Sequence, residues 1–245
     1  MASVRILLTF DDGPHAGALG GENRTEKVLD ALRHKCAKAA FFIQTHVPHR
    51  LASTTGARIA SRIYSEGHVL AIHTGSFVDH RCHKWRCTQL PDLPGASNGL
   101  DSDMIRAKAE IKQIAGTDPK FVRATYGYTD AYCMRVYAKN NLKHVYWDIV
   151  SGDDAKLPTC ASVRARLGAE TKRLASGTVD LIYLLHDINQ VTAEHLTEFI
   201  DAIAASVRAN GNTPIFVADR AEAEFIMDRK SREGTDTPCP ADSMG

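Results

Sequence analysis

The stretch from Val4 to Pro14, VRILLTFDDGP, joins an apolar run to two adjacent carboxylates and a glycine–proline pair. The run Val4–Phe10 has the length of a buried strand, and Asp-Gly-Pro is strong turn chemistry, so the pattern predicts a strand followed by a loop. Two acidic side chains at a strand end can divide the work of a hydrolase, one binding a cation and the other moving a proton. A simple turn explains the same residues, and this stretch alone does not decide between the two.

Similar short apolar runs recur along the chain, with helical stretches between them. Further strands are predicted at residues 39–43, 69–72, 120–122, 145–149, 181–185 and 214–217. Helices are predicted at residues 25–35, 52–65, 101–115, 130–140, 161–175 and 192–209. Alternating strands and helices imply a parallel sheet or barrel. The full 245 residues are compatible with one such domain.

Polar residues stand where the predicted strands end. They are Asp11, Asp12, His73, Arg123, Asp148, His186 and Asp187. In parallel α/β folds the carboxyl ends of the strands meet at one face, and that face carries the functional site. A lone histidine is usually structural, but five separate segments that bring polar residues to one face are hard to explain by core packing.

Composition excludes several classes of protein. Hydrophobic residues make up 44% and charged residues 24%, which is an ordinary globular mixture. No stretch approaches the roughly 18 apolar residues of a membrane span. The chain has 30 Lys and Arg against 29 Asp and Glu, so no global field attracts a polyanion and we expect no nucleic-acid partner.

The cysteines and the start of the chain bear on its location. The six cysteines are an even number, which permits pairing in an oxidising compartment, but connectivity cannot be read from sequence. The first apolar run, Val4–Phe10, is too short for the core of a signal peptide. We therefore expect an extracellular, periplasmic or cell-envelope location if an upstream export signal is missing from this chain, and a cytoplasmic one otherwise.

Five segments together resemble the NodB-homology polysaccharide deacetylases. They are TFDDGP at residues 9–14, His73-Thr74, RATYG at residues 123–127, residues 147–153, and LLHD at residues 184–187. The resemblance implies an α/β chain folded as a single-domain distorted (β/α) barrel, which we place at residues 1–227, followed by a polar, frayed tail at residues 228–245. It also implies a metal-dependent hydrolase that removes acetyl groups from an N-acetylated polysaccharide or oligosaccharide, such as peptidoglycan, chitin-like chains or poly-N-acetylglucosamine.

The resemblance assigns roles position by position. Asp11 matches the catalytic base, which Arg123 would orient. Asp12 and His73 match two ligands of one divalent metal ion, which we expect to be zinc, with cobalt or nickel as alternatives. The backbone N–H of Tyr126 would stabilise the oxyanion, and Tyr126 would also contact the substrate. His186 would protonate the leaving amine, and Asp153 would orient His186 and tune its pKa. Leu184 would line the substrate site.

The chain departs from the family pattern at the expected third metal ligand. Phe77 stands where a histidine is usual, and His80 is the nearest substitute. If this segment were helical, seven residues would separate His73 from His80 by about 10.5 Å of rise, too far for one zinc ion. If the segment loops, His80 can return to the metal, and we name it as the candidate third ligand.

Other departures concern the substrate. Ala124-Thr125 replaces two prolines, and Asp154 replaces an aromatic residue. Trp85 lies in a long irregular stretch and is a candidate sugar-stacking platform. Beside it, Cys82 and Cys87 could form a disulfide, join a small zinc site with His80 and His83, or remain free thiols.

Two other functions therefore stay open. The first is a non-catalytic glycan-binding domain on the same barrel that has lost its metal, which Phe77 motivates. The second is an O-acetyl esterase of the acetylxylan type, since that reaction needs the same metal and oxyanion donors. The sequence leaves the oligomeric state undetermined.

Overall fold

The computed structural model describes residues 2–17, 23–47, 50–75, 80 and 99–233. The strands are β1 (Ser3–Asp11), β2 (Ala39–Gln44), β3 (Val69–Thr74), β4 (Phe121–Val122), β5 (Lys143–His144), β6 (Ile149–Val150), β7 (Val179–His186) and β8 (Thr213–Phe216). They form one sheet with the order β5-β4-β3-β2-β1-β7-β6, and β8 pairs with the first part of β1. Every pairing in it is parallel.

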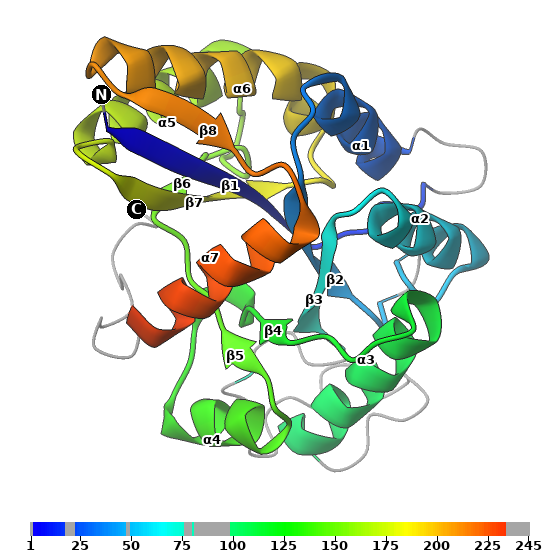
Figure 1. Cartoon of the computed structure of the whole chain (residues 1–245). Helices are drawn as coiled ribbons and strands as arrows, with labels where there is room; N and C mark the ends of the chain where they lie inside the picture. The colour runs from blue at the N-terminus through cyan, green and yellow to red at the C-terminus, as the bar shows by residue number, and fades with distance from the viewer. Residues whose placement is uncertain (1, 18–22, 48–49, 76–79, 81–98, 234–245) are drawn as a thin grey trace.

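Helices surround this sheet. They are α1 (Arg24–His34), α2 (Thr54–Ser65), α3 (Leu100–Ala115), α4 (Ala131–Lys139), α5 (Cys160–Leu174), α6 (Gln190–Ala209) and α7 (Arg220–Glu233), with a 3₁₀ turn at Thr125–Gly127. Figure 1 shows α1 to α6 arranged around the curled sheet and α7 crossing the middle of the view. The expected single-domain distorted (β/α) barrel is confirmed. It is an incomplete barrel, because β5 and β6 are the two ends of the strand order.

Alternation along β1 explains why the sheet has one apolar face and one functional face. Ile6, Leu8 and Phe10 join the large core that also contains side chains of α1 and α6. Leu7 belongs to a second cluster on the other face. Because side chains alternate along a strand, the positions that follow on this second face are polar, ending with Asp11. The inner face of the curled sheet is thus apolar at its amino end and polar at its carboxyl end.

Helix α7 corrects the expected boundary of the tail. We expected a frayed segment from Asp228 onward, but the helix continues to Glu233. Ala223, Ile226 and Met227 are buried in the inner cluster, and their spacing of three and four residues is that of one helix face. Asp228 also pairs with Lys143 of β5. The helix is therefore held by apolar burial on one side and by ion pairs on the other.

The predicted strand at residues 145–149 is also corrected. Ladder pairing occurs just before it, in β5 with β4, and from its last residue, Ile149, onward, in β6 with β7. Between them the chain crosses from one end of the sheet to the other, and Asp148 Oδ2 accepts a hydrogen bond of 2.8 Å from the Ile182 N–H. The Asp148 carboxylate also pairs with Lys230 at 2.9 Å. Asp148 therefore serves the packing of the sheet and of α7.

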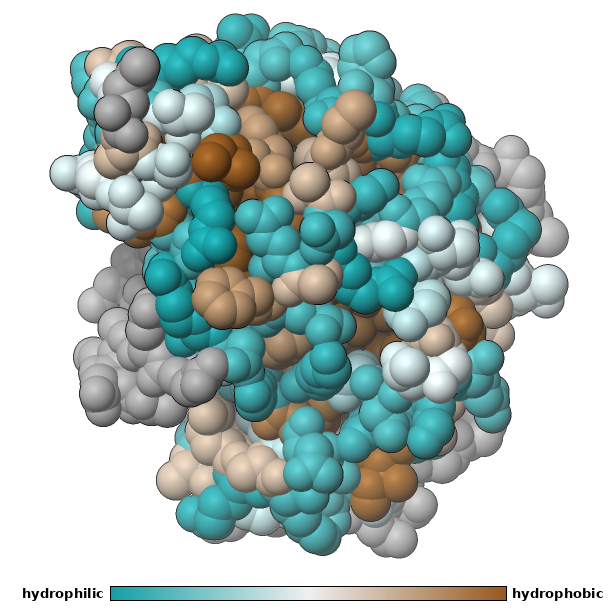
Figure 2. Space-filling model, viewed as in Figure 1, coloured by the Kyte–Doolittle hydropathy of each residue, from teal (hydrophilic) through white to brown (hydrophobic). Residues whose placement is uncertain are grey.

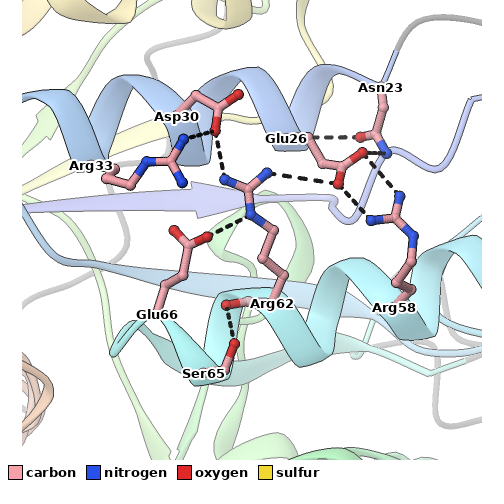
Figure 3. A network of polar contacts seen from close by, with 8 residues as sticks. All are labelled: Asn23, Glu26, Asp30, Arg33, Arg58, Arg62, Ser65 and Glu66. Carbon is pink, nitrogen blue, oxygen red and sulfur yellow. Dashed lines mark hydrogen bonds and ion pairs between the residues drawn. The ribbon is translucent and has the colours of Figure 1, made fainter.

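The surface carries a network of charged side chains between α1 and α2, drawn in Figure 3. Arg58 of α2 forms two hydrogen bonds with Glu26 of α1, at 2.7 and 3.0 Å. Arg62 contacts Asp30 of α1 and Glu66, both at 2.6 Å. Such exposed pairs contribute little individually, but a network shares the entropic cost of ordering the side chains. It fixes the mutual position of the two helices that flank β2.

The rest of the visible surface is ordinary. On the face in Figure 2, hydrophilic residues predominate and hydrophobic residues form small, separate groups. Within the described ranges, none of the helices has both the length and the apolar content to cross a membrane.

Candidate active site

Strand register brings the predicted residues together at the carboxyl end of the sheet. Asp11 ends β1 and is paired directly with His186, the last residue of β7. His73 stands near the end of β3, and Arg123 directly follows β4. Four strands thus deliver one polar side chain each to the same end of the barrel, as the sequence pattern predicted.

Asp11 is held by a buried arginine. Arg123 is fully buried, and its Nη1 donates hydrogen bonds to Asp11 Oδ1 at 2.9 Å and to Thr9 Oγ1 at 2.7 Å. Its Nε donates to the Val145 carbonyl at 3.0 Å, and its guanidinium lies 4.1 Å from the Phe42 ring centroid. Burial lowers the pKa of Arg123, while the charge of Asp11 and its hydrogen bond oppose this. The arrangement fixes the direction of the Asp11 carboxylate.

Asp12 and His73 form the second part of the site. His73 Nδ1 lies 2.9 Å from the Arg123 carbonyl, which can only accept, so Nδ1 carries a hydrogen. Its other nitrogen, Nε2, lies 3.3 Å from Asp12 Oδ1. Gln44 at the end of β2 donates to the same oxygen at 2.7 Å. A backbone carbonyl that fixes the histidine tautomer in this way is typical of a histidine that binds a metal through its other nitrogen.

The charges at this pair also favour a cation. Burial raises the pKa of Asp12, but its hydrogen bond to His73 and the charges of His73, His186 and Arg50 bring the pKa down to about 2. Burial lowers the pKa of His73, but the charges of Asp11 and Asp12 and the hydrogen bond to Asp12 raise it. Two carboxylates therefore lie against one imidazole. A divalent ion between Asp12 and His73 would compensate the same negative charge that the His73 proton compensates now.

The residues present fit a borderline divalent metal in their donor chemistry. Imidazole nitrogen and carboxylate oxygen are ligands of zinc, cobalt and nickel alike. The structure brings Asp12 and His73 together but does not bring His80 to them. Instead, His80 is buried with its Nδ1 2.6 Å from the Tyr137 hydroxyl of α4. Over the described ranges, His80 belongs to no group of three His, Cys, Asp or Glu ligand atoms within 4.8 Å of one another.

His186 is held by Asp153 in a manner suited to a proton donor. Asp153 Oδ1 lies 2.8 Å from His186 Nδ1, and its Oδ2 accepts the His186 N–H at 2.8 Å. Burial lowers the pKa of His186, but the hydrogen bond and charge of Asp153 and the charges of Asp11 and Asp12 raise the pKa to about 10. His186 is therefore positively charged at neutral pH. This pKa lies above the near-neutral value that is most favourable for a general acid at neutral pH.

Asp153 has no free lone pair for a metal. Besides the two contacts with His186, its carboxylate accepts hydrogen bonds from Ser151 Oγ at 2.8 Å and Thr192 Oγ1 at 2.5 Å. Ligand atoms of Asp153, Asp154 and His186 lie within 4.8 Å of one another. Four hydrogen bonds nevertheless use all the acceptor positions of a carboxylate. These contacts favour a role for Asp153 in orienting His186.

The turn that carries Tyr126 is constrained from both sides. Tyr126 has left-handed backbone angles (φ 58°, ψ 10°), and its side chain is exposed. Before it, the Ala124 N–H donates to His144 Nε2 at 3.1 Å. After it, Gly127 has φ 67°, and a Cβ added there would lie 2.8 Å from Trp147 Cη2. The position of the Tyr126 N–H is thus set by two close contacts rather than by the prolines usual in the resembled family.

The remaining candidates divide between described and undescribed residues. Leu184 is buried in β7, two residues before His186 and therefore on the same face of the strand. Trp85 and Phe77 lie outside the described residues, as do Cys82, His83 and Cys87.

Sequence reasoning missed several residues that contact the site. They are Thr9, Gln44, His144, Ser151 and Thr192. For Thr9 and Gln44 a signal was available, because Thr9 shares the face of Asp11 and Gln44 is a polar strand end like the others. The contact of Ser151 with Asp153 is local, two residues along the chain, whereas those of His144 and Thr192 depend on how segments 20 and 39 residues apart pack.

The structure is thus a curled, incomplete parallel α/β barrel with a carboxylate and an imidazolium side by side at the carboxyl ends of its strands. The family described as Polysaccharide deacetylase matches residues 2–145. The chain belongs to this family, which confirms the resemblance drawn from its motifs.

Curated relatives and solved structures agree with this assignment. The chain is 28% identical over 151 residues to a peptidoglycan-N-acetylglucosamine deacetylase of Bacillus cereus, covering 61% of this chain and 46% of the relative. It is 28% identical over 217 residues to a chitin deacetylase of Pestalotiopsis sp, covering 86% and 62%. The chain thus spans about half the length of these relatives. A chitin deacetylase from the fungal pathogen Colletotrichum lindemuthianum has the same fold, with a TM-score of 0.63, 20% identity and 89% of each chain covered.

Proposed function

We propose that this chain removes acetyl groups from an N-acetylated polysaccharide or oligosaccharide. We also propose that it binds one divalent metal ion at Asp12 and His73, with zinc as the preferred candidate. One observation carries the proposal. The register of β1 and β7 sets a carboxylate, Asp11, beside an imidazolium, His186, with the Asp12–His73 pair next to them. A base, an acid and a cation site at one place are what hydrolysis of an amide requires.

An amide is a poor electrophile with a poor leaving group. When bound, the metal ion would polarise the acetyl carbonyl and acidify water. Asp11, oriented by Arg123, takes the proton of the attacking water. The Tyr126 N–H stabilises the negative charge that develops on the acetyl oxygen. His186, which Asp153 keeps protonated, delivers a proton to the departing nitrogen, and Leu184 gives the site an apolar wall.

The named relatives support an N-acetylglucosamine chain as the substrate class. Those cited above act, by name, on peptidoglycan N-acetylglucosamine and on chitin. A further relative with 28% identity over 153 residues is a chitooligosaccharide deacetylase of Bradyrhizobium sp.. The chain carries a formal net charge of +1, which is compatible with a neutral or mixed-charge glycan.

The test is acetate release. Purified protein is incubated with N-acetylglucosamine oligomers and with peptidoglycan, each with added zinc, cobalt or nickel, and an Asp11→Asn variant is the control. We expect metal-stimulated release by the wild type only. Release no greater than that of Asp11→Asn in all three metals would overturn the proposal.

A metal-poor glycan-binding domain is the second candidate, because the structure does not bring His80 to Asp12 and His73. Elemental analysis after purification without chelator separates the two. A stoichiometric metal that is lost in the Asp12→Asn variant supports the enzyme, whereas glycan binding without metal or turnover supports the binding domain. Comparing acetylated xylan with chitooligosaccharides separates N-deacetylation from the O-acetyl esterase reaction.

A further inference from the structure

A pocket beside the active site is lined by residues that the deacetylation mechanism does not use. Its volume is about 450 Å³, and it lies where the loop after Asp153 meets the amino ends of α5 and α6. Asp153 and Asp154 line it on one side, and Cys160, Glu194 and His195 on others. The pocket therefore extends from the residue that holds His186 to a cysteine and a histidine.

Three potential metal ligands converge there from two helices. One ligand atom each from Cys160, His195 and Glu198 lies within 4.8 Å of the other two. Cys160 is the first residue of α5, while His195 and Glu198 are three residues apart on α6, so they project from the same face of that helix. Metal sites built between packed helices use glutamate and histidine three residues apart on one helix, with the glutamate first, and His195 and Glu198 have the same spacing in the reverse order.

In the structure these groups bind one another. The Cys160 thiol donates to Glu198 Oε2 at 3.4 Å, and His195 Nδ1 lies 2.8 Å from Glu198 Oε1. Arg164 also pairs with Glu198 at 3.3 Å, but both side chains are about half exposed, and such a pair contributes little. Each present contact is thus one that a cation can replace at small cost.

We propose that Cys160, His195 and Glu198 bind one zinc-class divalent ion, at a site separate from Asp12 and His73. A thiolate, an imidazole and a carboxylate are a borderline-soft donor set that suits zinc or cobalt, whereas magnesium and calcium take oxygen ligands. Three protein ligands leave a fourth position, and because Cys160 and His195 line the pocket, that position opens toward it.

Binding would exchange a proton for the metal. The Cys160 thiol releases its proton to solvent as the sulfur–metal bond forms, and the Glu198 oxygen that accepted that proton becomes available to the ion. Burial and the adjacent Glu198 raise the pKa of the Cys160 thiol in the metal-free protein. Because zinc-class ions bind the thiolate and not the thiol, the proton that the Cys160 thiol shares with Glu198 has to leave when the ion binds.

Cobalt absorption provides the test, because cobalt bound to thiolate has a near-ultraviolet charge-transfer band that cobalt bound only to nitrogen and oxygen lacks. The probe is Co²⁺ added to the full chain carrying Asp12→Asn and His73→Ala, which disables the proposed catalytic pair. We expect one equivalent bound with a thiolate band. Adding Cys160→Ser should abolish the band, and adding His195→Ala should weaken Co²⁺ binding at least tenfold. Adding Cys36→Ser, at an exposed free cysteine, is the matched control and should change nothing.

A second measurement uses the unmodified chain and needs no variant to fold. Zn²⁺ should protect Cys160 from alkylation by iodoacetamide at least tenfold, while Cys36 reacts at the same rate with and without zinc. Absence of the thiolate band, a band that survives Cys160→Ser, or equal alkylation of Cys160 in both conditions would overturn the proposal. Because none of these readouts is activity, the result is independent of whether the chain deacetylates a glycan.

Discussion

Arg123 and Asp11 form an ion pair that is closed off from solvent, with Nη1 2.9 Å from Oδ1 and side chains 0% and 5% exposed. The two residues are 112 positions apart in the chain, and they meet because β4 and β1 end at the same edge of the sheet. A buried pair is weak evidence for stability in itself. Here the ion pair orients the Asp11 side chain, because the guanidinium binds Oδ1 and leaves Oδ2 to accept a proton.

Removing the arginine should therefore damage both stability and turnover. Arg123→Met leaves the Asp11 carboxylate buried without its counter-charge, and breaking a buried pair in this way costs about 3–5 kcal/mol. We expect a loss of that size in urea unfolding, together with loss of acetate release. Arg123→Lys keeps the positive charge but cannot make all the hydrogen bonds of the guanidinium group. It should therefore be more stable than Arg123→Met and still be inactive. Equal unfolding midpoints for Arg123→Met and the wild type would contradict this account.

The contact between Asp153 and His186 should control the alkaline limb of the pH–activity profile. His186 must be protonated to act as an acid, so activity falls as pH rises through its pKa, which is about 10 in the metal-free chain. Asp153→Asn removes the charge and should move this limb to lower pH. A cation bound at Asp12 adds positive charge near His186, so it moves the alkaline limb to lower pH in the wild type and in Asp153→Asn alike.

The exposed Asp154 provides the matched control. The Asp154→Asn exchange removes the same charge beside His186 without touching the Asp153 hydrogen bond. It should shift the alkaline limb by less than Asp153→Asn does. An equal shift in the two variants would show that net charge, and not the hydrogen bond, sets the pKa of His186.

A buried carboxyl group next to the site should make stability depend on pH. Burial raises the pKa of Asp187 from its ordinary 3.8 to about 7, although a hydrogen bond of 2.5 Å from Thr25 opposes this. The folded state thus keeps a proton that the unfolded state loses. The contribution to stability is complete below about pH 4, falls as pH rises, and levels off above about pH 7, with a total loss on the order of 4 kcal/mol.

Unfolding free energies at pH 4.5 and pH 7.5, measured with a chelator present, check this prediction. The Asp187→Asn variant keeps an oxygen for Thr25 and has no charge, so its stability should change less over this interval than that of the wild type. Asp201→Asn, at a largely exposed side chain, should follow the wild type. A pH dependence unaltered by Asp187→Asn would show that Asp187 is ionised throughout.

Local patterns in the sequence predicted the parallel strands and their polar ends because each depends on only a few neighbouring residues. The strand Val4–Phe10 was placed from its apolar run and the Asp-Gly-Pro turn, and it is confirmed as β1. No helix was predicted at α7, although Ala223, Ile226 and Met227 have helical spacing, and the polar residues from Asp228 onward, which form its last part, were assigned to a tail. The position of α7 depends on burial of its apolar side against the inner face of the sheet, which a local sequence pattern does not reveal.

In the site, too, some features follow from local sequence patterns and others depend on tertiary packing. Asp11, His73, Arg123 and His186 could be brought to one place from strand ends alone. Contacts such as Thr192 with Asp153 could not be predicted, because they depend on where α6 packs after the chain has folded. The interaction of His80 with Tyr137 is a similar case: His80 was named as a metal ligand because it is the histidine nearest to Phe77, but in the structure it contacts Tyr137 of α4.

Gly127 offers a final test of how the turn around Tyr126 is positioned. An alanine there has two costs: φ is 67°, which costs an L-residue roughly 1–2 kcal/mol, and its Cβ would lie 2.8 Å from Trp147 Cη2. The matched control is Gly116→Ala at the end of α3, where φ is 73° but nothing lies within 4 Å of the added Cβ. We expect Gly116→Ala to lower the free energy of unfolding by the conformational cost alone and to leave acetate release unchanged.

Gly127→Ala should cost more stability than Gly116→Ala and should also lower kcat, because the clash displaces the Tyr126 N–H from the developing oxyanion. Combining it with Trp147→Phe removes the ring edge that the new Cβ meets. The double variant should therefore recover turnover while keeping the conformational cost of the positive φ. If Gly127→Ala and Gly116→Ala have the same effect on stability and on kcat, the contact with Trp147 does not position this turn.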